Sequence, residues 1–107
     1  MTTTAFVTVA QVSEILPDHG LQVVVHGRSV AVFLHQGEWS AIDDECPHKK
    51  TPLSQGNCAY GQVSCPMHGW TFNLRTGACT EAPHKPVVIH EVRTVGNELQ
   101  IRLNHHP

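Results

Sequence analysis

Two short segments of this chain repeat the same pair of residue types, and they constrain the fold more than any other feature. Cys46-Pro47-His48 and Cys65-Pro66-Met67-His68 each offer one thiol and one imidazole. The spacing is C-x-H, sixteen residues, then C-x-x-H. Two loops of this kind can hold one metal centre from opposite sides, and the rest of the chain is expected to serve as their scaffold.

The residues before the first segment predict a three-stranded meander. Leu21–Val25 and Ser29–Leu34 are short β-branched runs, and His26-Gly27-Arg28 between them suits a hairpin turn. Gln36-Gly37-Glu38 then reverses the chain, and Trp39–Ile42 completes the meander. The last strand leads directly into the first Cys-His segment.

The two ends of the chain also predict strands. Phe6–Val12 alternates apolar and polar residues as an edge strand does, and Ser13–Pro17 suits a single turn stopped by proline. Val87–Val95 and Glu98–Leu103 flank Gly96-Asn97, a pair typical of a hairpin turn. Because no apolar period of helix length occurs, seven or more short strands predict an all-β fold, an antiparallel β-sandwich or small barrel.

Length and charge limit the function. A chain of 107 residues suits one compact domain, so we expect a single domain over residues 1–107, with the metal-binding part at about residues 43–84. Seven Lys and Arg against nine Asp and Glu offer no basic surface for nucleic acid or an anionic membrane. The sequence contains no secretory signal or membrane-spanning run, so we expect a cytoplasmic protein.

Four cysteines and nine histidines are many for this length. In a chain without export signals they indicate metal or redox chemistry more than a disulfide framework. Cys58 and Cys79 lie outside the two segments, and we interpret them as ordinary buried or half-buried thiols. We expect His26, His35 and His90, which lie at strand ends or within a strand, to be satisfied or solvent-facing rather than ligands.

A structural zinc ion is the simplest occupant of the two segments, since zinc accepts mixed Cys and His ligands. Zinc modules, however, usually group two cysteines first and two histidines later. Here each segment carries one Cys and one His in the same order. Two facing loops can then place both sulfurs on one metal and both nitrogens on a second, as a binuclear cluster requires.

Together with Gly69-Trp70-Thr71-Phe72 and Thr76-Gly77, the two segments resemble the Rieske [2Fe-2S] family, and the resemblance covers nearly the whole chain. It implies a Rieske-type antiparallel sandwich with a small cluster-binding subdomain. It also implies one [2Fe-2S] cluster per chain, with Cys46 and Cys65 on one iron and His48 and His68 on the other.

The resemblance also predicts the redox range. With neutral imidazoles the oxidised core carries no net charge, so an electron is accepted more easily than by an all-cysteine cluster. High-potential members add a loop disulfide and two hydroxyl donors, at positions where this chain has Lys50, Met67, Trp70 and Phe72. Because hydrogen bonds to sulfur favour the reduced core, their loss predicts a low potential and excludes a quinol-oxidising role.

Several residues near the ligands have supporting roles in this interpretation. Pro47 and Pro66 fix the loop backbone and Gly69 permits close approach of backbone N–H groups, although ordinary turn geometry explains all three equally well. Pro83 resembles the third loop that covers the cluster in the family. His84 could join Lys49 and Lys50 in a partner surface, although adjacent lysines are more often a solvated turn.

No catalytic constellation accompanies the ligands. Rieske oxygenases add a domain with a mononuclear iron, for which 107 residues leave no room, so we expect an electron carrier. The leading hypothesis is a Rieske-type ferredoxin that passes electrons from a flavin-dependent reductase to the terminal oxygenase of a ring-hydroxylating dioxygenase. The second is the small subunit of an assimilatory NAD(P)H nitrite reductase, which segments 15–20, 30–33 and 52–56 resemble. The third is a zinc-stabilised binding module without a redox role.

Overall fold

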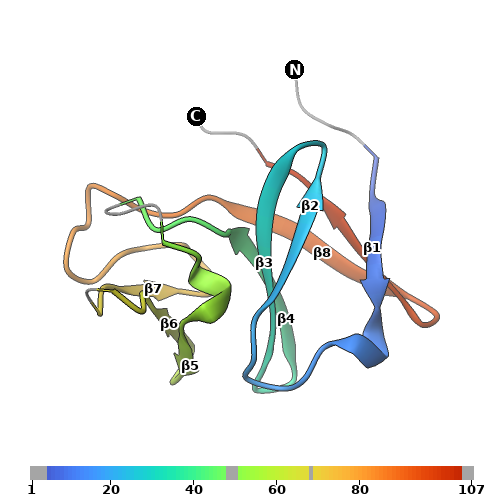
Figure 1. The fold of residues 1–107 in the computed structure, drawn as a ribbon, viewed down its shortest axis with the longest axis horizontal. Coiled ribbons are helices and arrows are strands. Elements are labelled where there is room, and N and C mark those ends of the chain that lie inside the picture. The colour runs from blue at the N-terminus through green and yellow to red at the C-terminus, as the bar shows by residue number, and fades with distance from the viewer. Residues whose placement is uncertain (1–4, 48–50, 68, 105–107) are drawn as a thin grey trace.

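The computed structural model describes residues 5–47, 51–67 and 69–104, and in these ranges it is built of antiparallel strands without an α-helix (Figure 1). The predicted all-β antiparallel fold is confirmed. The strands are β1 (Val7–Gln11), β2 (Leu21–Val25), β3 (Arg28–His35), β4 (Glu38–Asp43), β5 (Asn57–Ala59), β6 (Gln62–Ser64), β7 (Thr71–Asn73), β8 (Ile89–Val95) and β9 (Glu98–Arg102). Two 3-10 helices accompany them, η1 (Val12–Glu14) and η2 (Leu53–Gln55).

The larger sheet has six strands in the order β1-β9-β8-β4-β3-β2. Its two edge strands, β1 and β2, approach each other, so the sheet curls toward a barrel (Figure 1). β1 is therefore the edge strand that the sequence predicts. None of the helices in the described ranges has the length and apolar character to cross a membrane.

Two tight turns set the register of the predicted meander. At His26-Gly27 and at Gln36-Gly37 both central residues have positive φ, 49° and 80° in the first turn and 54° and 76° in the second. Such turns match the right-handed twist of the flanking strands, and glycine reaches positive φ without strain. The strands β2, β3 and β4 consequently pair as the sequence predicts.

Strand β3 is buried on both of its faces. Val30 and Val32 point into one apolar cluster, which we call the barrel core, and Ala31 and Phe33 point into a second, the loop core. The barrel core contains Ala10, Ile15, Val23, Val25, Val30, Val32, Ala41, Leu99, Ile101 and Leu103. The loop core contains Ala31, Phe33, Ile42, Cys46, Leu53, Val63, Cys65, Phe72, Leu74, Cys79, Ala82 and Val87.

The smaller sheet, β5-β6-β7, packs across the loop core from β3 and β4 (Figure 1). Its strands have three residues each, too few for a sequence period to show. β6 and β7 flank the second Cys-His segment, and β4 leads into the first. The fold therefore brings the two segments to the same end of the molecule, around one apolar core.

A polar network fixes the end of β4, where the chain turns toward the first segment. Arg28 Nη2–H and His90 Nε2–H both donate to Asp43 Oδ1, each at 2.7 Å. The Asn104 backbone N–H donates to His90 Nδ1 at 3.0 Å, so His90 is the neutral tautomer that carries its proton on Nε2. Arg28 Nη1–H also donates to Asn104 O at 2.8 Å. The network joins β3, β4, β8 and the segment after β9.

The same contacts set the ionisation of Asp43. Burial alone raises the pKa of its carboxyl, but the hydrogen bond from His90 and the charge of Arg28 outweigh burial and bring the pKa below the ordinary 3.8. A lowered folded-state pKa means that Asp43 contributes stability above pH 3.8 and loses it as the pH falls through the folded value.

Phe33→Ala should lower the free energy of unfolding by about 3–5 kcal/mol, because it empties a fully buried site in the loop core. Val24→Ala is the matched control on the neighbouring strand β2. Val24 is 68% exposed, and its truncation should change stability by less than about 0.5 kcal/mol. Urea unfolding measures both. A loss below about 1 kcal/mol for Phe33→Ala would contradict the central place of β3.

Arg28→Met should raise the pKa of Asp43, because it removes a charge and a hydrogen bond while burial remains. Acid destabilisation should then begin at a higher pH than in the unmodified protein. Carbon-13 NMR titration of the aspartate carboxyls measures the pKa. Arg75→Met, which removes an exposed pair with Glu38, is the control and should leave Asp43 unchanged. An unaltered Asp43 pKa in Arg28→Met would show that Arg28 does not hold this carboxylate.

Candidate metal centre

The first Cys-His segment forms a loop closed by its own cysteine. Cys46 follows β4 by three residues, and its backbone N–H donates to Thr51 O at 2.9 Å. We call residues 46–51 ligand loop 1. The side chain of Cys46 is 0% exposed, in the loop core. Residues 48–50, which include the predicted ligand His48 together with Lys49 and Lys50, lie outside the described residues.

The second segment repeats this closure. Cys65 follows β6 directly, and its backbone N–H donates to Trp70 O at 2.7 Å, again five residues along the chain. We call residues 65–70 ligand loop 2. Gly69, with φ of 72°, donates its N–H back to Cys65 O at 2.9 Å, and a positive φ at this position suits glycine. Cys65 is 2% exposed, and the predicted ligand His68 lies outside the described residues.

Cys46 and Cys65 both belong to the loop core, so one apolar cluster contains both predicted cysteine ligands. No disulfide joins either of them to another described cysteine. Soft thiolate donors inside a water-excluding apolar shell suit an iron-sulfur cluster, whose potential depends on solvent exposure. The cysteine half of the predicted site therefore fits the cluster, and the four-residue ligand set stays a prediction.

A third loop is tied to ligand loop 2 by a carboxylate. Glu81 Oε1 accepts the Thr71 backbone N–H at 2.8 Å and the Thr71 hydroxyl at 3.2 Å. The hydrogen bond from the Thr71 N–H lowers the pKa of Glu81 below its ordinary value. Ala82 belongs to the loop core with both cysteines, whereas Pro83 and His84 are exposed. The contacts place this loop beside ligand loop 2.

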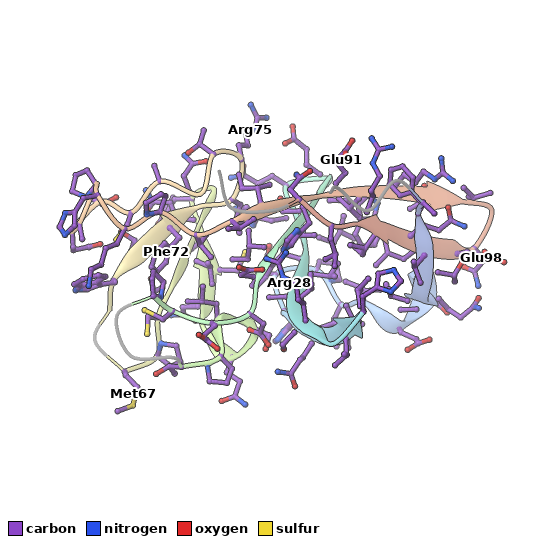
Figure 2. All side chains as sticks on the ribbon, turned by 90° about the horizontal axis from the view of Figure 1, so that it is seen from above. Arg28, Met67, Phe72, Arg75, Glu91 and Glu98 are labelled. Carbon is purple, nitrogen blue, oxygen red and sulfur yellow. The ribbon has the colours of Figure 1, made fainter. Side chains whose placement is uncertain are left out.

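Three apolar side chains of the ligand loops are exposed among the described residues. Pro47, Pro66 and Met67 are exposed, and Met67 is 64% exposed at the end of the molecule opposite Glu98 (Figure 2). Phe72, by contrast, is fully buried in the loop core, and Trp70 packs against it. Met67, Trp70 and Phe72 carry no thiol or hydroxyl, so they cannot form the loop disulfide or donate the hydroxyl hydrogen bonds of the high-potential members.

A second group of metal-type side chains lies outside both loops. Possible ligand atoms of Asp18, His35 and Cys58 lie within 4.8 Å of one another. The Gly61 N–H donates to His35 Nε2 at 2.8 Å, so His35 carries its proton on Nδ1 and donates it to Asp18 Oδ1 at 2.6 Å. Both ring nitrogens are thus engaged, and a metal on either would displace a hydrogen bond.

The two cysteines outside the ligand loops are also accounted for. Burial, with a smaller effect from Asp18, raises the pKa of the Cys58 thiol to about 11, which disfavours the thiolate that a metal needs. Cys79 is buried in the loop core, and its thiol lies 3.8 Å from Glu81 Oε1. Neither forms a disulfide, as predicted for ordinary half-buried and buried thiols. His26 is exposed, and His90 is buried with both nitrogens bonded.

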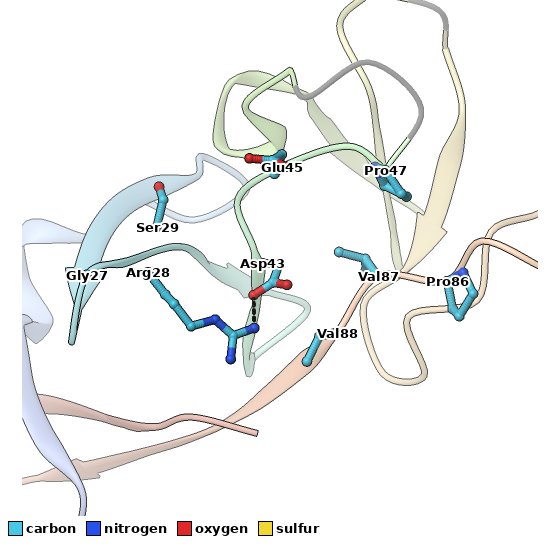
Figure 3. Close-up of a pocket in the computed structure, with 9 residues that line it drawn as sticks. All are labelled: Gly27, Arg28, Ser29, Asp43, Glu45, Pro47, Pro86, Val87 and Val88. Atoms are coloured by element: carbon cyan, nitrogen blue, oxygen red, sulfur yellow. Dashed lines mark hydrogen bonds and ion pairs between the residues drawn. The ribbon is translucent and has the colours of Figure 1, made fainter. Parts of the chain in front are cut away.

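A cleft of about 420 Å³ lies beside ligand loop 1 (Figure 3). Its walls are Gly27, Arg28, Ser29, Asp43, Glu45, Pro47, Pro86, Val87 and Val88. Neither predicted cysteine ligand lines it. The Arg28 and Asp43 side chains on its wall are bonded to each other.

Sequence reasoning missed the carboxylates that hold the loops. No pattern in the sequence assigned a role to Asp44 or to Glu81. Their partners, Ser54 and Thr71, follow the ligand loops closely in the chain. A carboxylate and a hydroxyl residue flanking a ligand loop are the signal that could have pointed to them.

Known proteins with similar sequences and folds include ferredoxins of dioxygenase systems. The biphenyl dioxygenase ferredoxin subunit of Pseudomonas sp. (strain KKS102) is 32% identical over 98 residues, 90% of this chain and 90% of the relative. The ferredoxin of carbazole 1,9a-dioxygenase from Nocardioides aromaticivorans IC177 has a TM-score of 0.84 at 28% identity, over 92% of this chain and 97% of the other.

Other similarities show only a shared fold or a match to a small part of a longer protein. A putative NADH-dependent nitrite reductase small subunit from Mycobacterium tuberculosis shares the fold, with a TM-score of 0.86 at 22% identity, over 95% of this chain and 97% of the other. The chain spans only 8%, 16% and 9% of the length of three oxygenases that it also matches. The Rieske [2Fe-2S] domain itself matches residues 5–96. The chain therefore belongs to the Rieske [2Fe-2S] domain family.

Proposed function

We propose that this chain is a one-electron carrier that passes electrons from a flavin-dependent reductase to a terminal oxygenase. The observation that carries the proposal is the pair of buried cysteines, Cys46 and Cys65, at equivalent positions of two equivalently closed loops around one apolar core. In this assignment they bind one iron of a Rieske cluster, and His48 and His68 bind the other. The bound cluster supplies a one-electron redox couple.

The chain's own residues have two tasks in this function. The loop core, with Phe72 and Leu53 fully buried, keeps water away from the thiolates. The exposed Pro47, Pro66 and Met67 offer a small apolar surface on the described part of the loops. Electron-carrier interfaces are small and transient, and an apolar contact of this size suits them. His84, exposed on the third loop, can extend this surface.

Similarity to a ferredoxin subunit over 90% of both chains supports the carrier more than the other candidates. In this proposal residues 1–107 act as one domain in the cytoplasm, with the cluster-binding part at about residues 43–84. The carrier has no catalytic residue of its own. Its redox partners are a reductase and an oxygenase, and neither nucleic acid nor a membrane is a partner.

A fixed subunit of a nitrite reductase is the second candidate. Two of the segments that resemble those subunits, residues 15–20 and 52–56, meet in the structure. A side chain on Gly20 would lie 2.3 Å from Ser54 O, so the backbones are in direct contact there. The resemblance therefore forms a continuous patch rather than scattered positions, and such a patch can serve a permanent interface.

Reduction of the purified chain by a flavin-dependent reductase with NADH, and reoxidation by a terminal oxygenase, should proceed at catalytic rates. The protein should contain about two iron and two acid-labile sulfide per chain. Cys46→Ala should abolish both the cluster and the transfer. Cys79→Ala is the matched control, since Cys79 is buried in the same core but is no predicted ligand, and should retain both.

Three outcomes would contradict this proposal. Stoichiometric zinc without sulfide would favour the zinc-stabilised module. Tight co-purification with a large nitrite reductase subunit, with no reduction by a flavin-dependent reductase, would favour the fixed subunit. Loss of the cluster in Cys79→Ala, with retention in Cys46→Ala, would reverse the ligand assignment.

The reduction potential should lie in the lower part of the roughly −150 to +300 mV range of Rieske centres, because Phe72 and Trp70 provide no hydroxyl to the cluster sulfurs. His68→Cys should lower it further, since a third thiolate charge opposes reduction. His84→Gln, on the exposed third loop, is the control and should leave it nearly unchanged. Protein-film voltammetry measures all three proteins. An unaltered potential in a loaded His68→Cys protein would remove His68 from the ligand set.

A further inference from the structure

Asp44 is a buried carboxylate with an unusual pair of partners. Its side chain is 4% exposed, two residues before Cys46. Oδ1 accepts the Ser54 backbone N–H at 2.6 Å, and Oδ2 accepts the Ser54 hydroxyl at 2.8 Å. One serine thus bonds both carboxyl oxygens, and hydrogen bonds of this kind are what a buried polar side chain requires.

These bonds join the two ends of ligand loop 1. Asp44 precedes the loop and Ser54, in η2, follows it, while the Cys46–Thr51 backbone bond lies between them. The Asp44 N–H also donates to Ser29 O on β3 at 3.0 Å, so the near end of the loop is anchored to the larger sheet. The loop is therefore held at its base by a side chain and closed within by the backbone.

The segment that follows Ser54 leads toward the second cysteine, Cys65. Gly56 follows η2, and a side chain there would lie 2.0 Å from Ser64 O. Such a close backbone approach requires glycine. Asn57, the next residue, pairs with Ser64 in the small sheet, and Ser64 directly precedes Cys65. The path from Asp44 through Ser54 to Ser64 thus links the entrance of ligand loop 1 to the entrance of ligand loop 2.

We propose that Asp44 is a positioning residue for the cluster: its carboxylate holds ligand loop 1 against η2, so that Cys46 keeps a fixed separation from Cys65. This inference rests on the ligand assignment of the proposed function. Asp44 touches neither iron nor sulfide in this role, and acts through the loop backbone. Two thiolates on one iron must meet a narrow geometry, so a loosened base should show in the cluster before it shows in the fold.

The test compares Asp44 with a residue that matters only for global stability. Asp44→Ala removes both acceptors, Ser54→Ala removes the hydroxyl alone, and Asp44→Asn keeps one oxygen acceptor in the same shape. Leu99→Ala is the control, because Leu99 is fully buried in the barrel core on β9, away from the ligand loops. For each holo-protein we would measure the free energy of unfolding, the rate of iron release to a chelator and the EPR g-values of the reduced cluster.

Asp44→Ala should release iron at least about tenfold faster than the unmodified protein, because it removes two buried hydrogen bonds, either of which can account for a factor of about ten, and its g-values should shift. Asp44→Asn and Ser54→Ala should release iron faster than the unmodified protein and more slowly than Asp44→Ala. Leu99→Ala should lose at least as much unfolding free energy yet keep the unmodified release rate and g-values. If Asp44→Ala does not accumulate, Asp44→Asn and Ser54→Ala carry the same comparison.

Two results would overturn the inference, and they differ from failure of the proposed function. If the iron-release rate correlated with the free energy of unfolding across all variants, including Leu99→Ala, Asp44 would have only a structural role. If Asp44→Ala kept the iron-release rate and the g-values of the unmodified protein, Asp44 would have no positioning role. An unmodified protein without iron and sulfide would instead overturn the ligand assignment, and this inference with it.

Discussion

The burial of strand β3 on both faces is the constraint on which the rest of this structure depends. A strand in an open antiparallel sheet usually faces solvent on one side, and its residues alternate accordingly. Val30, Ala31, Val32 and Phe33 are all fully buried, so β3 must be covered twice. The curled sheet covers one face, and the small sheet with both ligand loops covers the other. The loops are consequently part of a hydrophobic core rather than appendages to it.

This arrangement explains how two short loops can hold their cysteines in defined positions. Loops usually lie on the surface and are mobile because few contacts hold them. Here each ligand loop starts from a strand, buries its cysteine and closes on a carbonyl five residues later. A carboxylate beside each loop then accepts an N–H and a hydroxyl from one residue, Ser54 for Asp44 and Thr71 for Glu81. Pro47, Pro66 and Met67 on these loops are exposed, so the buried cysteines lie beside a surface that a partner can reach.

Patterns over a few neighbouring residues predicted the elements whose structure depends mainly on those residues. The hairpins at His26-Gly27 and Gln36-Gly37 were predicted because turn residues and β-branched runs are close in the chain. The strands β5, β6 and β7 were not assigned, because three residues show no period and their pairing depends on the core they cover. The Asp44–Ser54 contact escaped notice for a related reason: ten residues and a folded loop separate the partners. The cysteine ligands were predicted from spacing, since coordination chemistry restricts spacing directly.

The two groups of Cys and His in this chain differ in how their hydrogen bonds are made. Asp18, His35 and Cys58 are close enough to hold an ion, yet His35 already accepts a backbone N–H and donates to Asp18. Burial, with a smaller effect from the nearby Asp18 carboxylate, also raises the pKa of the Cys58 thiol. Cys46 and Cys65 lie in loops that close through backbone hydrogen bonds. Both cysteines are buried in the loop core, where an apolar shell surrounds the thiol groups that the sequence predicts as ligands.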